Sequence, residues 1–153
     1  MPDVAALREP GRVFVSWHAG DRLVGCIGSL EPRLPLHEAV AHFAVESGLH
    51  DPRTPGTTLE ELAELRCEIS VLSAATEIEP IGLGPISAAL QPGRDGVVLR
   101  AGLRKAVFLP VVWTKLRTPK EFLEALCHKA GIDPARDGDA VRAAVFTTET
   151  FEE

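Results

Sequence analysis

One cysteine lies between two closely spaced glycines, in the segment Gly25-Cys26-Ile27-Gly28. Glycines leave no side chain to shield a neighbouring thiol, so Cys26 is a candidate nucleophile or carrier. Such a thiol reacts as the thiolate, and it requires a nearby histidine, basic side chain or helix N-terminus to lower its pKa. The alternative is that Cys26 packs as a small buried apolar side chain, as cysteines commonly do. Cys67 and Cys127 lack flanking glycines and are predicted to lie in the core.

Other side chains are candidates to assist this thiol. His50 and Asp51 adjoin a loop with two prolines, where either side chain could act as a base or an orienting group. Glu68 lies in an otherwise apolar segment. If the Glu68 side chain is buried, it must be paired or functional. If its face of the strand is open to solvent, Glu68 is simply an exposed residue. The acidic and imidazole side chains that recur every four residues are predicted to form a solvated helix face rather than a metal site: Glu38, His42, Glu46 and His50.

Composition narrows the class of protein. The chain has 153 residues, of which 45% are hydrophobic and 25% charged, and this excludes a disordered chain. A formal charge of −6 with only 5% aromatic residues disfavours general nucleic-acid binding. Residues 94–136 are an exception, with nine basic and four acidic side chains. We predict a solvated surface there, with an RNA- or phosphate-binding patch as the alternative.

The cysteine pattern and the apolar pattern predict the compartment. Three cysteines without a CxxC spacing favour reduced thiols over disulfides or structural zinc. The first residues lack the charged and apolar regions of a signal peptide, and no apolar run is long enough for a membrane helix. We therefore expect a soluble cytoplasmic protein that uses no metal and no cofactor and does not associate with a membrane.

Hydrophobic patterning predicts the elements that hold the candidate residues. Segments 12–17 and 23–30 read as a hairpin, and the second strand is expected to be central because both its faces are apolar or small. Its glycines indicate a bulge or a close approach to its backbone. Segment 35–48 is predicted to be a helix that stops at Gly48.

The remaining elements follow similar signals. A capping-box pattern from Thr58 to Glu61 predicts a short helix over 59–65, and 66–73 alternates as a strand. A hairpin over 96–112, a helix over 118–130 and a strand over 141–147 follow, whereas 81–86 is expected to be irregular. Hairpins mixed with helices predict an α+β fold with a mainly antiparallel sheet and flanking helices.

Seven segments, taken in order, resemble the AMMECR-domain family, also called AmmeMemoRadiSam system protein A. They are LVGCIG at 23–28, DPRTP at 51–55, CEISVLS at 67–73, GRDGVVL at 93–99, FLP at 108–110, FLEALCHKAG at 122–131 and FEE at 151–153. Three positions depart from the family pattern: Val24 replaces an Arg, Thr54 a Phe and Val111 a Gln. Any anion contact of that Arg is therefore lost or moved.

The resemblance implies a domain over residues 12–153, after a short tail at 1–11, with a larger and a smaller lobe around a cleft. It places these residues at the site: Gly25, Cys26, Ile27, Gly28, Asp51, Arg53, Glu68, Pro110 and Lys129. Members of this family resemble proteins encoded beside, or fused to, a Memo-like protein and a radical-SAM protein. Those two proteins are therefore the partners that the resemblance implies.

Two main functions follow. In the first, the protein is an enzyme in which Cys26 is nucleophile or carrier, Asp51 or His50 is the base, and Arg53 binds an anionic group. In the second, the Gly25–Gly28 backbone lines a groove for a small molecule or a protein partner. We favour the second, because P-loop, HExxH and GxSxG signatures are absent from the sequence. An RNA-associated role of the basic stretch is a third alternative.

Overall fold

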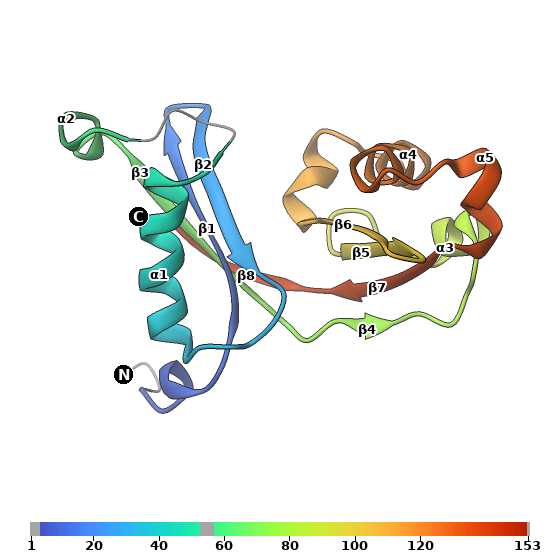
Figure 1. The fold of residues 1–153 in the computed structure, drawn as a ribbon, viewed down its shortest axis with the longest axis horizontal. Helices are drawn as coiled ribbons and strands as arrows, with labels where there is room; N and C mark the ends of the chain where they lie inside the picture. The colour runs from blue at the N-terminus through green and yellow to red at the C-terminus, as the bar shows by residue number, and fades with distance from the viewer. Residues whose placement is uncertain (1–3, 53–56, 153) are drawn as a thin grey trace. The chain divides into compact units, whose positions relative to one another are not determined.

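A computed structural model describes residues 4–52 and 57–152 of the chain. Contacts divide the chain into two units, one formed by Met1–Leu72 with Glu149–Glu153 and the other by Ser73–Thr148. Each unit has its own sheet (Figure 1). Each unit also has its own cluster of buried apolar side chains. The chain therefore builds most of the first unit, completes the second, and returns to the first for its last strand.

The first unit is a four-stranded sheet with one long helix packed on one face (Figure 1). The strand order is β2-β1-β3-β8. Its elements are η1 (Ala6–Arg8), β1 (Arg12–Ala19), β2 (Arg22–Ser29), α1 (Leu36–Leu49), α2 (Leu59–Leu62), β3 (Arg66–Leu72) and β8 (Thr148–Glu152). Alternate residues of a strand point to opposite faces, and Val13 and Val15 of β1 are fully buried in the cluster that α1 covers.

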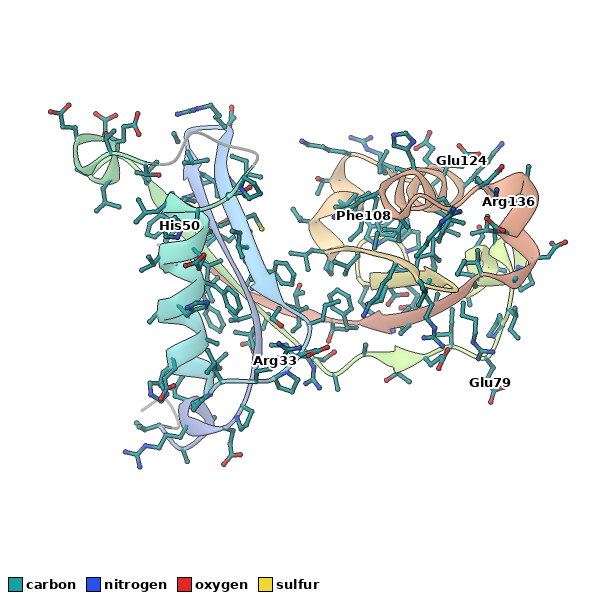
Figure 2. All side chains as sticks on the ribbon, viewed as in Figure 1. Arg33, His50, Glu79, Phe108, Glu124 and Arg136 are labelled. Carbon is teal, nitrogen blue, oxygen red and sulfur yellow. The ribbon has the colours of Figure 1, made fainter. Side chains whose placement is uncertain are left out.

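The second unit holds the antiparallel sheet β4-β7-β5-β6. Its elements are β4 (Thr76–Glu77), α3 (Leu83–Ala89), β5 (Gly96–Ala101), β6 (Arg104–Phe108), η2 (Pro110–Thr114), α4 (Pro119–Ala130), α5 (Pro134–Asp137), η3 (Gly138–Ala140) and β7 (Arg142–Phe146). Phe122 of α4 stacks on Trp113 with ring centroids 3.9 Å apart. Phe108, which is labelled in Figure 2, packs edge to face on Phe122. The Trp113 indole N–H donates to the carbonyl oxygen of Asp95 at 2.7 Å, so this buried polar atom is satisfied.

The predicted class, α+β with a mainly antiparallel sheet and flanking helices, is confirmed. Helix boundaries follow the predicted signals at two places. Thr58 and Glu61 form both hydrogen bonds of a capping box at the start of α2. Gly131 ends α4 with a φ of 74°, a left-handed conformation that favours glycine. The predicted tail at 1–11 and the predicted cleft between lobes stay predictions.

Four local expectations are wrong. The hairpin predicted over 96–112 ends at Phe108, because Pro110–Thr114 form η2. β2 lies at the edge of its sheet and is not central. Gly48 does not end the first helix, since α1 continues to Leu49. Residues 81–86 are not irregular throughout, because α3 begins at Leu83; Pro85 lies in its first turn, where a missing N–H removes no helical hydrogen bond.

The core of the second unit supplies a matched test of burial. Leu126 in α4 is fully buried, whereas Leu103 in the turn between β5 and β6 is fully exposed. We expect Leu126→Ala to lower the free energy of unfolding by about 2–5 kcal/mol, because it leaves a cavity. Leu103→Ala should change that free energy by less than about 0.5 kcal/mol. Urea unfolding followed by circular dichroism measures both, and equal effects would contradict this core.

Candidate functional site

The glycines at 25 and 28 allow two close backbone contacts. A Cβ added at Gly25 would lie 1.8 Å from the carbonyl oxygen of Ser47, in the last turn of α1. A Cβ added at Gly28 would lie 2.3 Å from the carbonyl oxygen of Val13 in β1. Atoms this close overlap, so both positions require glycine. The predicted close approach to this backbone is confirmed, and the approaching groups belong to the chain itself.

Asp51 covers part of the open edge of β2. Its Oδ2 accepts a hydrogen bond from the backbone N–H of Cys26 at 3.0 Å, and the residue is only 3% exposed. An edge strand presents N–H groups with no ladder partner, and a buried carboxylate requires donors, so this contact serves both groups. Because Asp51 lies two residues beyond α1, it also ties the end of that helix to β2.

The side chain of Cys26 lies on the sheet face away from α1. Cys26 is opposite Ser16 in β1, and Ser16 is opposite Glu68 in β3, so the three form one cross-strand row. Trp17, the next residue in β1, faces α1 through a hydrogen bond to Ala44, and neighbouring strand residues alternate. Cys26 is half-buried. Asp51 thus reaches the backbone of Cys26 from the strand edge, and the catalytic roles expected for these two residues stay predictions.

His50 follows the last residue of α1 (Figure 2) and is exposed to solvent. Its Nδ1 lies 3.1 Å from Oε1 of Glu46, one turn earlier, and its side chain is 60% exposed. This contact gives the imidazole a partner on its own helix. The role of His50 as a base stays a prediction, and Arg53, expected to bind an anionic group, lies outside the described residues together with Thr54.

Glu68 is largely buried and belongs to a small polar cluster. Burial, with a hydrogen bond between its carboxyl group and that of Glu152, raises the pKa of Glu68. Burial also lowers the pKa of His18, and the positive charge of Arg66 adds to that effect. His18 Nε2 and Glu68 Oε2 are 4.0 Å apart, but both shifts favour the neutral forms. Both shifts therefore oppose the ion pair that the two groups would form if both were charged.

The other predicted site residues are divided between the two units. Ile27 lies in β2 of the first unit, on the face toward α1. Pro110 begins η2, and Lys129 lies in the last turn of α4, both in the second unit. The ammonium of Lys129 donates to the carbonyl oxygen of Val107 at 2.8 Å and lies 5.2 Å from the ring centroid of Phe108. Their membership of a common binding cleft stays a prediction.

The basic stretch at 94–136 is partly paired within the second unit. Arg100 forms an ion pair with Glu77, which also accepts a hydrogen bond from Arg142 at 2.8 Å. Arg104 lies 3.7 Å from a carboxylate oxygen of Asp137. These contacts neutralise part of the positive charge, which supports a solvated surface over a phosphate-binding patch.

Metal-ligand side chains do not gather in the described part of the chain. Residues 4–52 and 57–152 contain no group of three or more His, Cys, Asp or Glu side chains that could hold a metal ion. On the helix stripe, His42 packs edge to face on Phe43 with ring centroids 5.0 Å apart. Across these same ranges, no helix combines the length and the apolar character needed to cross a membrane.

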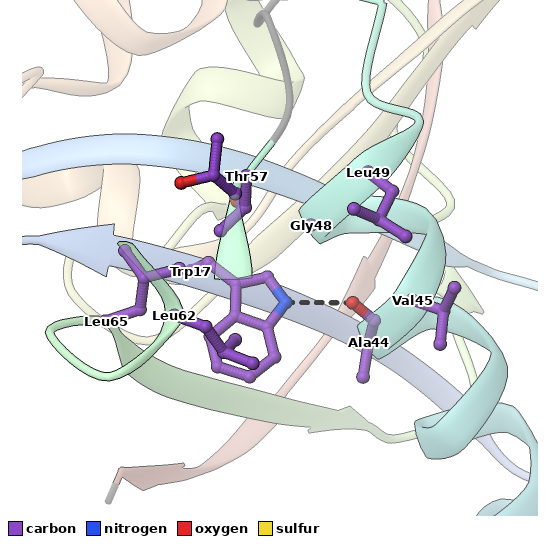
Figure 3. A pocket seen from close by; sticks show the side chains of 9 residues that line it. Trp17, Ala44, Val45, Gly48, Leu49, Thr57, Leu62 and Leu65 are labelled. Atoms are coloured by element: carbon purple, nitrogen blue, oxygen red, sulfur yellow. Dashed lines mark hydrogen bonds between the residues drawn. The ribbon is translucent and has the colours of Figure 1, made fainter. Parts of the chain in front are cut away.

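An apolar pocket of about 540 Å³ opens between the end of α1 and the segment around α2 (Figure 3). We call it the Trp17 pocket, and it is lined by Trp17, Ala44, Val45, Gly48, Leu49, Thr57, Thr58, Leu62 and Leu65. The Trp17 indole N–H donates to the carbonyl oxygen of Ala44 at 2.9 Å, which fixes the ring against α1 (Figure 3). Large apolar side chains at its rim remain about half exposed: Val45, Leu49 and Leu62.

Thr57, one of the lining residues, carries a buried polar atom. Its Oγ1 is buried and makes no hydrogen bond to any residue that the structure describes. A buried hydroxyl without a partner costs about 1–3 kcal/mol. Among the described lining residues, the surface that is open to the Trp17 pocket is therefore almost entirely apolar.

Sequence reasoning missed the Trp17 pocket and the partner of Glu68. The sequence does hold a signal for the pocket. The short helix predicted over 59–65 cannot bury all its leucines, Leu62 among them. The sequence holds no such signal for Glu152. This residue lies 84 positions after Glu68, and only the pairing of β3 with β8 brings the two side chains together.

The contact at Gly25 predicts a specific loss of stability. Gly25→Ala should lower the free energy of unfolding by about 1–3 kcal/mol, because the added Cβ overlaps the carbonyl oxygen of Ser47. Gly84→Ala is the control, since a Cβ there meets nothing within 4 Å and Gly84 lies in α3. That change should be neutral or stabilise by up to about 1 kcal/mol. Thermal or urea unfolding of the two variants compares them, and equal stability would disprove the close approach.

The carboxyl pair predicts a pH-dependent effect on stability. The raised pKa of Glu68 means that the folded state binds this proton more tightly than the unfolded state does. The stabilisation that protonated Glu68 provides is therefore fully present below pH 4.5, the ordinary pKa, and is lost as the pH rises through the raised pKa of the folded state. Glu68→Gln removes that titration, so it should stabilise the protein relative to wild type increasingly as the pH rises from 4.5 toward neutrality. Urea unfolding across this range measures the difference. Glu64→Gln, at an exposed position, is the control, and parallel pH profiles for Glu68→Gln and wild type would refute the assignment.

Comparisons with known proteins agree with this architecture. The model of the AMMECR1 family matches residues 2–151. Protein Ta0236 of Thermoplasma acidophilum is 34% identical over 138 residues, covering 86% of this chain and 66% of its own length. Protein PH0010 of Pyrococcus horikoshii is 38% identical over 141 residues, covering 86% of this chain and 64% of its own. This chain therefore spans about two thirds of the length of these relatives.

A solved structure gives the same result in three dimensions. The crystal structure of PH0010, described as an uncharacterized protein, superposes with a TM-score of 0.88 and 35% identity. The alignment covers 97% of this chain and 76% of that one. With a family model matched over nearly the whole sequence and a shared fold, the chain belongs to the AMMECR1 family.

Proposed function

We propose that this protein is a binding domain and that the Trp17 pocket holds the apolar part of its ligand or partner. The observation that carries the proposal is the pocket itself, about 540 Å³ of mostly apolar space with half-exposed leucines at its rim. Concave sites lined by apolar and aromatic side chains with few polar groups are typical of ligand-binding sites. Trp17 is held in place by its bond to Ala44, so this wall of the pocket is formed before binding.

The lining of the pocket favours binding over catalysis. None of the nine described lining residues carries a titratable group, so they offer no general acid, general base or thiol. The polar atoms are hydroxyl and backbone groups, which can orient a bound molecule.

The enzyme alternative rests on Cys26. The bond from the Cys26 backbone N–H to Asp51 supports a structural role for that carboxylate, as a cover of the strand edge. On our proposal, Cys26→Ser leaves binding at the Trp17 pocket unchanged. A turnover that Cys26→Ser abolishes would instead establish the enzyme.

The family resemblance supplies a biological setting for the proposal. We propose that the domain acts as an adaptor or ligand-binding component beside a Memo-like protein and a radical-SAM protein. A small molecule in that pathway, or a segment of one of those proteins, would occupy the Trp17 pocket. The resemblance supports this setting, and the pocket supports the mode of binding.

A neutral apolar dye tests whether the Trp17 pocket binds at all. N-phenyl-1-naphthylamine should bind saturably and gain fluorescence as it leaves water. Leu62→Asp should weaken binding by about tenfold or more, since it places a charge on the apolar rim. Leu103→Asp, at a fully exposed turn of the second unit, should leave the affinity unchanged. Dye binding that is equal in both variants, or absent from the wild type, would refute the proposal.

A further inference from the structure

Charge is divided unevenly between the two units. The first unit carries 6 basic and 14 acidic residues, a formal charge of −8, and the second carries 10 and 8, a charge of +2. The acidic character of the chain therefore belongs entirely to the unit that contains the Trp17 pocket. A field of one sign over a unit of this size attracts groups of the opposite sign and repels its own.

Acidic residues also concentrate on the segments that form the pocket. Residues 44–49 and 57–65 carry four carboxylates and no lysine or arginine: Glu46, Glu60, Glu61 and Glu64. Two of them have local partners, because Glu46 contacts His50 at 3.1 Å and Glu61 accepts from the N–H of Thr58 at 3.1 Å. Glu60 and Glu64 are exposed to solvent. Within residues 4–52 and 57–152, no ion pair joins Glu60 or Glu64 to a basic side chain, so these two carboxylates place negative charge beside the apolar rim.

We infer that the Trp17 pocket receives an aliphatic side chain carried by a positively charged segment of a partner protein. This inference rests on the proposed function, because it names the chemistry of what the pocket binds. An apolar anchor would fill the space beside Trp17, Leu49 and Leu62. Lysine or arginine residues flanking that anchor would meet Glu60 and Glu64. Apolar anchors in a central pocket supply most of the affinity of such interfaces, and rim charges supply steering and specificity.

The same charges disfavour other occupants. Phosphate groups of nucleic acids or anionic lipids would be repelled by a unit of charge −8. An acidic peptide would be repelled in the same way. A positively charged amphipathic segment can place apolar side chains against the rim of the pocket and basic side chains beside its carboxylates.

Two tryptophans allow a direct test on the intact chain. Their indole N–H groups give separate nuclear magnetic resonance signals, one from Trp17 in the pocket and one from Trp113 in the core of the second unit. The probes are a short amphipathic peptide of lysine and leucine and a matched peptide of glutamate and leucine. The lysine peptide should shift the Trp17 signal and leave that of Trp113 in place. It should bind about tenfold or more tightly than the glutamate peptide at low salt, and it should weaken as salt is added.

Variants test the effect of the acidic side chains on binding separately from the effect of the apolar pocket. Glu60→Gln with Glu64→Gln should weaken the lysine peptide about threefold to tenfold and leave dye binding unchanged. Glu79→Gln, at an exposed position of the second unit, is the control and should change neither.

Each contrary outcome would overturn either the inference about the partner alone or the proposed function as well. Equal affinity for both peptides, with dye binding intact, overturns the positively charged partner and leaves the proposed function standing. If neither the peptides nor the dye affects Trp17, both fail. A Trp17 signal that moves with protein concentration alone identifies a second copy of this chain as the occupant and overturns the inference.

Discussion

The close approach of the last turn of α1 to β2 is the constraint on which the first unit depends. Two contacts hold it directly, the close approach of the Ser47 carbonyl oxygen to Gly25 and the hydrogen bond from the Cys26 N–H to Asp51. A third, the hydrogen bond from Trp17 of β1 to Ala44, holds the preceding turn of α1. Each one joins α1, or the residues just after it, to the sheet. With this end of α1 held, the chain leaves toward α2 beside the indole ring, and the Trp17 pocket forms there.

The sheet of the first unit has two chemically different faces. One is apolar and covered by α1, and the other carries the row from Cys26 through Ser16 to Glu68. Burial of the polar cluster favours neutral forms of His18 and Glu68, since charges are costly to remove from water. The Gly25–Gly28 segment therefore serves several roles. Its glycines let backbone atoms of α1 and β1 come close, its N–H groups lie at a strand edge, and the Cys26 thiol lies in the polar row.

Local patterns were enough to predict most of the elements of the fold. The hairpin, the first helix, the capping box at Thr58 and the stop at Gly131 depend on residues close together in the sequence. The errors involve long-range contacts. β2 reads as a central strand because it is apolar and glycine-rich, but those glycines serve contact with α1 and β1. Gly48 reads as a helix stop, yet it lies within α1, where an added Cβ would come 3.3 Å from the Trp17 ring nitrogen.

The sequence by itself determined the class of the fold, the family and the identity of the residues at the Gly25–Gly28 segment, because these depend on composition, periodicity and ordered motifs. Only the tertiary structure decided what those residues contact. It paired Asp51 with the backbone of Cys26, Glu68 with Glu152, and Trp17 with the leucines beyond α1. Such contacts join residues up to 84 positions apart, and no local pattern encodes them, since they arise from strand pairing and helix packing across the whole unit.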